Sequence, residues 1–102
     1  MYLIQILLPL YTNSRQLFPD TLYESIRETL TERFGGVTAY QRSPALGHWK
    51  QSELLTVRDD IVVFEVMLDS IDLIWWQTYK EELRQVFEQD KLIIRALPFE
   101  LI

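Results

Sequence analysis

The run Ile61–Leu68, I-V-V-F-E-V-M-L, constrains the fold more than any other part of the sequence. Its β-branched, aromatic and aliphatic side chains are typical of a strand, and the run is too short for a typical buried helix. Tyr2–Leu8 has the same character, as expected for a central strand. Weaker strand patterns occur at Val37–Arg42 and Lys91–Leu97. The sequence therefore predicts four strands, of which Val37–Arg42 is the least apolar and should lie at an edge.

A first amphipathic helix is predicted between the first two strands. Pro19 suits its start, and Thr21 and Glu24 have the spacing of a capping box. Gly35 can adopt the positive φ that ends a helix. The apolar residues recur every four positions along one stripe: Leu22, Ile26, Leu30 and Phe34.

A second amphipathic helix is predicted between Ile61–Leu68 and Lys91–Leu97. It follows three residues that can cap a helix: Asp69, Ser70 and Asp72. Its apolar arc consists of Trp75, Trp76, Tyr79, Leu83, Val86 and Phe87. Leu73 and Ile74 lie off this arc. We expect Trp76 to be buried in the core and Trp75 to lie at its edge.

The order of these segments is β-α-β-β-α-β, which predicts a ferredoxin-like α+β sandwich. Two right-handed β-α-β crossovers give a four-stranded antiparallel sheet with both helices on one face. The first and third strands should be central, with the fourth beside the first and the second beside the third. Residues 1–102 are expected to form a single domain, because a chain of this length supports one core.

The alternation within the strands predicts which residues lie on the sheet face away from the helices. Glu65 should lie on this outer face, because an unpaired buried carboxylate costs several kcal/mol. The same test places Leu3, Gln5 and Leu7 there from the first strand. An outer face with so many aliphatic residues is typical of an association surface. The predicted interface residues are Gln5, Val63, Glu65, Met67, Ile93 and Arg95.

Gln5, Glu65 and Arg95 are the polar residues in the middle of this face. On adjacent strands, Glu65 and Arg95 would flank Gln5. One interpretation is an ion pair that satisfies a buried subunit interface. The other is a polar cluster lining a small-molecule cavity between the sheet and a partner.

Composition excludes several classes of function. The chain has 15 acidic and 10 basic residues, and a net charge of −5 does not suit a protein that binds the nucleic-acid backbone. It has no cysteine, which removes thiolate zinc sites and fits a reducing cytoplasm. No apolar run is long enough to cross a membrane, and no metal ligand spacing or cofactor motif is recognised.

The long connection from Ser43 to Asp60 is the predicted location of any ligand chemistry, because loops of this length are often functional. It contains the only histidine, His48, which is the candidate general base, although a lone histidine is also an ordinary polar loop residue. The candidate ligand-binding residues lie in or beside this connection: Tyr40, Arg42, His48, Trp49, Lys50 and Arg58.

The chain resembles an uncharacterised family of bacterial proteins of roughly 100 residues. The likeness rests on F-G-G-V-T-A-Y (34–40), S-P-A-x-G-x-W-K (43–50), D-x-V-x-F-E-V-M (60–67), W-W-x-x-Y (75–79) and F-x-Q (87–89). At the level of fold, the pattern is similar to PII-like and CutA-like trimers and to dimeric α+β barrel proteins. Some dimeric α+β barrel proteins are small oxygenases or isomerases, so an enzymatic activity of that kind is one expectation that this last resemblance implies.

Two functions are therefore expected. The first is a homo-oligomeric binding or regulatory module, a dimer or trimer, that associates through the outer sheet face and could also take a small-molecule ligand. The second is a small cofactor-free enzyme of the dimeric α+β barrel kind, an oxygenase or isomerase that uses His48. A closed polar pocket of about 300 Å³ or more would favour the enzyme.

Overall fold

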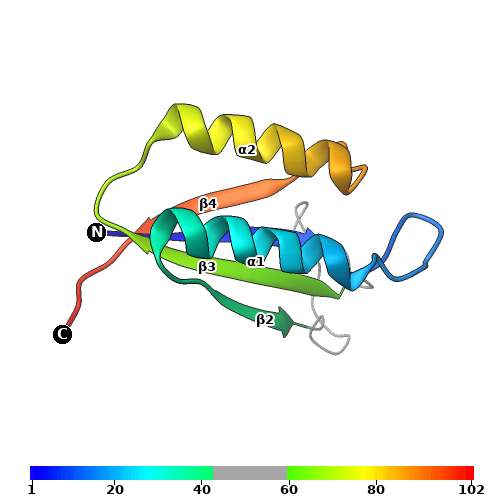
Figure 1. Ribbon diagram of the computed structural model, residues 1–102, viewed down its shortest axis with the longest axis horizontal. Coiled ribbons are helices and arrows are strands. Elements are labelled where there is room, and N and C mark those ends of the chain that lie inside the picture. The colour runs from blue at the N-terminus through cyan, green and yellow to red at the C-terminus, as the bar shows by residue number, and fades with distance from the viewer. Residues whose placement is uncertain (43–59) are drawn as a thin grey trace, which may run out of the picture.

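The computed structural model describes residues 1–42 and 60–102 of the chain. The elements in chain order are β1 (Tyr2–Pro9), α1 (Asp20–Phe34), β2 (Thr38–Arg42), β3 (Ile61–Leu68), α2 (Leu73–Val86) and β4 (Ile93–Pro98). Both helices lie over one face of a four-stranded sheet (Figure 1). The ferredoxin-like α+β sandwich predicted from the sequence is confirmed.

The sheet has the order β2-β3-β1-β4, with all neighbours antiparallel. The two most apolar strands, β1 and β3, are central, and the two strands with weaker patterns are at the edges, as the sequence predicted. The β3 bounds are those predicted, whereas β4 begins two residues later than expected, at Ile93. Leu92 precedes β4 and is buried in the core.

The first helix ends as predicted but begins differently. Gly35 has a φ of 84° and its N–H donates to the carbonyl of Thr31 at 2.8 Å, which closes the helix. At the other end, Pro19 is the N-cap and makes no side-chain cap hydrogen bond. The predicted capping box is therefore wrong, because Thr21 is already inside the first turn and cannot act as the N-cap.

The second helix is capped by Asp72, whose carboxylate accepts from the backbone N–H of Trp75 at 3.1 Å. Trp76, Tyr79, Leu83 and Phe87 are buried and Trp75 is half-buried, so the predicted helix phase is confirmed. Val86 is exposed, contrary to the prediction. It lies about 80° around the helix from Trp76, at the edge of the arc, and is the last residue of the helix.

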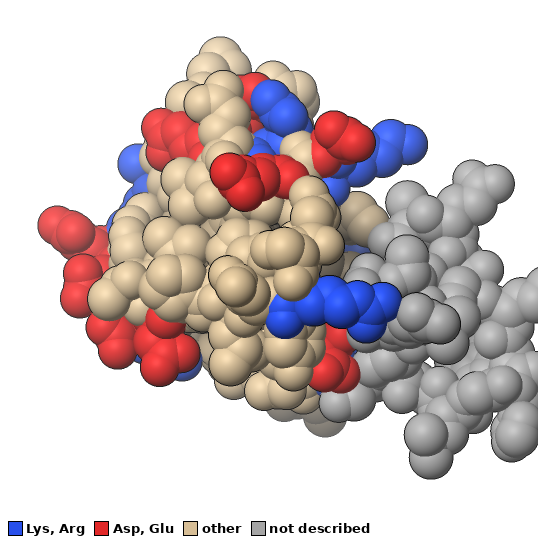
Figure 2. Space-filling model, turned by 90° about the vertical axis from the view of Figure 1, so that its right-hand side faces the viewer, with Lys and Arg blue, Asp and Glu red and all other residues tan. Residues whose placement is uncertain are grey.

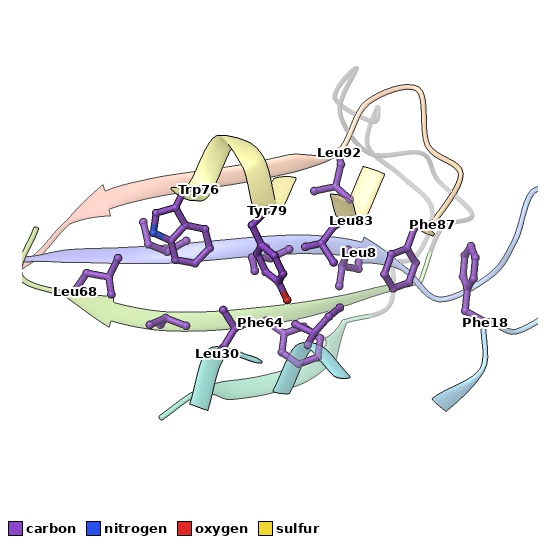
Figure 3. Packing of buried hydrophobic residues seen from close by; sticks show 14 residues of the cluster. Leu8, Phe18, Leu30, Phe64, Leu68, Trp76, Tyr79, Leu83, Phe87 and Leu92 are labelled. Atoms are coloured by element: carbon purple, nitrogen blue, oxygen red, sulfur yellow. The ribbon is translucent and has the colours of Figure 1, made fainter. Parts of the chain in front are cut away.

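The main core lies between the helices and the inner sheet face. Trp76, Tyr79 and Leu83 extend from α2 toward β1 and β3, where they meet residues such as Phe64 (Figure 3). At one end of the core, the rings of Phe18 and Phe87 meet edge to face with centroids 4.9 Å apart. This packing holds the sheet rigidly from one side and leaves its other face to the residues described next.

Candidate functional site

A row of hydrogen-bonded polar side chains crosses the outer face of the sheet. The strand register places Gln5 of β1 opposite Glu65 of β3 and opposite Arg95 of β4. The predicted adjacency of these three residues is therefore confirmed. Tyr40 of β2, which is paired with Val63, lies on the same face and extends the row to the edge. We call Tyr40, Glu65, Gln5 and Arg95 the polar row.

The hydrogen bonds of the polar row converge on the carboxylate of Glu65. Arg95 Nε donates to Gln5 Oε1 at 2.7 Å, and Gln5 Nε2 donates to Glu65 Oε2 at 2.7 Å. The Tyr40 hydroxyl donates to the same Glu65 oxygen at 3.1 Å. The amide of Gln5 thus accepts from the cation on one side and donates to the anion on the other.

Within the single chain, Glu65 and Arg95 do not form a direct ion pair with each other. The ion pairs found among residues 1–42 and 60–102 are Arg33–Asp72 at 3.6 Å and Arg84–Glu81 at 2.7 Å. β1 lies between the strands of Glu65 and Arg95, so their side chains are two strand spacings apart, roughly 10 Å. Gln5 fills this separation and links the two charges.

The environment of Tyr40 favours its protonated form. Partial burial raises the pKa of the Tyr40 phenol above its usual value, and the hydrogen bond that it donates to the Glu65 carboxylate raises it further. Tyr40 is therefore a donor at neutral pH and holds one oxygen of Glu65 in place. The row has a negative group on β3, a neutral amide in the centre and an exposed cation on β4.

The apolar residues of the outer face form two groups on either side of the row. On one side, Leu7, Ile61 and Val63 are buried and Ile93 packs against them. On the other side, Met67 is 59% exposed, Leu97 is 40% exposed and Leu3 is half-buried. We call Leu3, Met67 and Leu97 the exposed apolar end. These three side chains share a register row, because Leu3 pairs with Met67 and with Leu97.

This division changes the role expected of one predicted interface residue. Val63 is only 2% exposed within the single chain, so its side chain is not available to a partner. Met67 and Arg95 are exposed, while Gln5, Glu65 and Ile93 are half-buried. The interface assignment of these residues stays a prediction, and the structure directs it toward the polar row and the exposed apolar end.

A hollow of about 430 Å³ opens to solvent beside Glu65. Its lining joins the outer face to the end of the first helix: Leu3, Phe34, Gly35, Gly36, Val37, Thr38, Glu65 and Met67. Neither Tyr40 nor Arg95 lines it, and it is not the closed pocket that would favour an enzyme. Sequence reasoning missed this hollow, because its lining comes from three segments, at positions 3, 34–38 and 65–67, that meet only after folding.

The predicted ligand-binding residues are only partly placed. Tyr40 belongs to the polar row, and Arg42 ends β2, exposed and paired with Ile61. His48, Trp49, Lys50 and Arg58 lie outside the described residues, as does the connection that carries them. The roles expected of these four residues, including that of His48 as a general base, stay predictions.

The charged side chains of the described surface seen in Figure 2 do not gather into one patch. Acidic and basic side chains are interspersed there, with uncharged surface between them. Among the described residues, no three or more His, Asp or Glu side chains are grouped as metal ligands. No helix in the described ranges is long and apolar enough to span a bilayer.

Comparison of the chain with models of protein families, with curated proteins and with solved structures gives no match. The arrangement of the outer face is therefore the basis of the functional interpretation.

Proposed function

We propose that the protein is a small homo-oligomeric binding or regulatory module that associates with itself through the outer sheet face. The observation that carries this proposal is the exposed apolar end. Met67 and Leu97 present aliphatic side chains beside the polar row, on a face that neither helix covers. Burial of this surface by a second copy would remove it from water.

The polar row supports the same proposal. A polar group at a subunit contact is tolerated only when its hydrogen bonds are made. Gln5 already donates to Glu65 within one chain at 2.7 Å, and each of the two side chains has one further partner in the row. The hydrogen bonds of Gln5 and Glu65 can therefore be kept when the row enters an interface.

The test is the oligomeric state of two matched variants, measured by sedimentation velocity. Met67→Glu places a charge on the exposed apolar end, and we expect it to convert the assembly to monomers, because the carboxylate would lose its water at the contact. Ile74→Glu is the control, since Ile74 is 79% exposed on α2, away from the outer face. A monomeric wild type, or an assembly that Ile74→Glu disrupts and Met67→Glu does not, would contradict the proposal.

A second candidate function is a cofactor-free enzyme, an oxygenase or isomerase, with His48 as the base. The hollow beside Glu65, about 430 Å³, has room for a small substrate, but it is open to solvent and lacks the enclosure that such an enzyme requires. Native mass spectrometry of the purified protein tests this function. We expect a retained small molecule that is lost when Thr38→Trp fills the hollow. A clean oligomer mass without any adduct would favour the module.

A further inference from the structure

We propose that two copies pack outer face to outer face about a two-fold axis that runs along β1, so that Glu65 of each copy lies opposite the partner's Arg95. This inference rests on the proposed function, because it assumes that the outer face is the contact. It adds the symmetry of the assembly, a dimer, and the residues that select its orientation.

The charge order of the polar row carries the argument. Glu65, Gln5 and Arg95 lie on the successive strands β3, β1 and β4, at one level of the sheet. The negative and positive groups are thus on opposite sides of a neutral residue at the centre. A row of this kind is complementary to its own reversed copy.

Two sheets that face each other can be related by a two-fold axis parallel to the strands or by one perpendicular to them, and only the first axis reverses the order of the row. A two-fold axis along β1 exchanges the two sides of the sheet, so Glu65 meets the partner's Arg95 twice in each dimer. A two-fold axis across the strands, along the row, leaves the order unchanged and places Glu65 against the partner's Glu65. Like charges brought together at a contact are unfavourable, and opposite charges fix the orientation.

The apolar residues fit the same axis. Leu3 is on β1, so it would meet the partner's Leu3, while Met67 on β3 would meet the partner's Leu97 on β4. Met67 and Leu97 are exposed and Leu3 is half-buried. The axis across the strands would instead place Leu3 over the partner's Leu7, whose side chain is already buried in its own chain.

The distances suit this arrangement. Packed sheets lie about 10 Å apart, which an arginine and a glutamate can span together. Facing sheets are usually rotated by about 30°, which would displace the ends of the row by roughly 2–3 Å. In the described part of the chain, Arg95 uses only its Nε atom, so its terminal nitrogens can reach the partner's carboxylate.

The test uses complementary charge reversals. Glu65→Arg alone would set two arginines against each other, and Arg95→Glu alone would set two glutamates against each other. We expect each variant to raise the dimer dissociation constant at least about tenfold. An equimolar mixture of the two should form a heterodimer, because every contact then pairs opposite charges. The double variant Glu65→Arg/Arg95→Glu should also dimerise, since the Gln5 amide can rotate to exchange its donor and acceptor.

Sedimentation equilibrium measures these constants, and circular dichroism checks that each variant is folded. A wild type that is a monomer would refute the proposed function itself. A wild-type dimer that neither single reversal weakens, or a mixture that fails to associate, would overturn this inference and leave the outer-face contact standing. A trimer would also overturn it.

A second measurement does not depend on charge variants that fold. The chain has no cysteine, so Leu3→Cys introduces a single thiol. We expect a short bis-maleimide to link Leu3→Cys into covalent dimers, because this position lies on the axis. Met67→Cys should link poorly, because the partner's Met67 is on the other side of the axis. Efficient linking of Met67→Cys with none of Leu3→Cys would contradict the axis.

Discussion

The two faces of the sheet are built from alternate residues of the same strands, and they differ in how their side chains are satisfied. On the inner face, Ile6, Phe64 and Val66 are buried against aromatic residues of the two helices. On the outer face, Gln5 and Glu65 are half-buried and hydrogen-bonded, and Met67 is exposed. The inner face therefore carries most of the stability of the chain, while the outer face is the surface through which we propose that it associates. Five predictions test this division.

The largest effect is expected in the helix that covers the inner face. Trp76→Ala should lower the free energy of unfolding by about 3–5 kcal/mol, as the loss of a large core aromatic does. Trp76 stacks on Phe34 with ring centroids 5.3 Å apart and is buried. Trp75→Ala is the matched control and should cost less, because Trp75 is only half-buried. Urea denaturation that ranked the two variants in the opposite order would show that the helix phase is wrong.

The next prediction compares adjacent residues of β3 that point to opposite faces. Val66→Ala should cost about 1.5–3 kcal/mol, because the side chain is buried in the main core. Met67→Ala removes more atoms but should cost less than about 0.5 kcal/mol, because Met67 is exposed. Denaturation at a concentration where the protein is monomeric measures both. If both variants lowered the free energy of unfolding equally, the side chain of Met67 would have to be as well packed within one chain as that of Val66.

A smaller effect is expected for a hydroxyl on the inner side. The Tyr23 hydroxyl donates to the carbonyl of Pro9 at 2.6 Å, at the end of β1. Tyr23→Phe should lower the free energy of unfolding by about 1 kcal/mol, since the hydrogen bond is lost. Thermal denaturation at neutral pH measures the change. A neutral result would indicate that water replaces the phenol at the carbonyl.

The same tyrosine makes stability depend on alkaline pH. Burial, with a smaller contribution from Asp20, raises the pKa of Tyr23 from 10.0 to about 12, and burial also raises the pKa of Tyr79 to about 12. The folded chain keeps these protons after the unfolded chain has lost them, so their contribution is complete below pH 10 and is lost as the pH rises from 10 to 12. Tyr23→Phe should reduce the slope of stability against pH in this window.

A small effect on the free energy of unfolding of the monomer is also expected at the centre of the polar row. Gln5→Met removes both of its hydrogen bonds, at 2.7 Å each. We expect the free energy of unfolding to change by less than roughly 1 kcal/mol. Glu65 is half-buried and Arg95 is exposed, so water can replace the amide as their hydrogen-bond partner. Urea denaturation below the dimer dissociation constant tests this, with wild type under the same conditions as the control. A loss as large as that of Val66→Ala would place the row inside a dry environment.

The sequence predicted the fold well because its strongest patterns report burial. Alternation in Ile61–Leu68 and the cost of burying Glu65 together identified the outer face correctly. The four-residue stripe of α1 and the αL glycine at its end were also confirmed. Such patterns reflect local periodicity and solvation, which a single sequence contains.

The outer face was predicted less completely, because its details depend on contacts between distant residues. That an amide would connect the two charges could not be decided before the register of β1 was known. The burial of Val63 was likewise not encoded in the alternation, which distinguishes the two faces of a strand but not the two ends of one face. The capping box failed for a different reason: with Thr21 as the N-cap the helix would begin at residue 22, but it begins at Asp20, two residues earlier.

The amide of Gln5 also has a consequence for how the chain folds. A slip of β1 by one residue would turn the Gln5 side chain into the core and the apolar side chains out of it, and the cost of burying the amide excludes this pairing. A slip by two residues keeps each side chain of β1 on its own face of the sheet. Leu3 or Leu7 would then take the central position of Gln5, and either leucine suits the apolar outer face. Only the correct alignment sets an amide between Glu65 and Arg95. The hydrogen bonds therefore distinguish pairings that hydrophobicity cannot, and they give the central strand one alignment among several of similar burial.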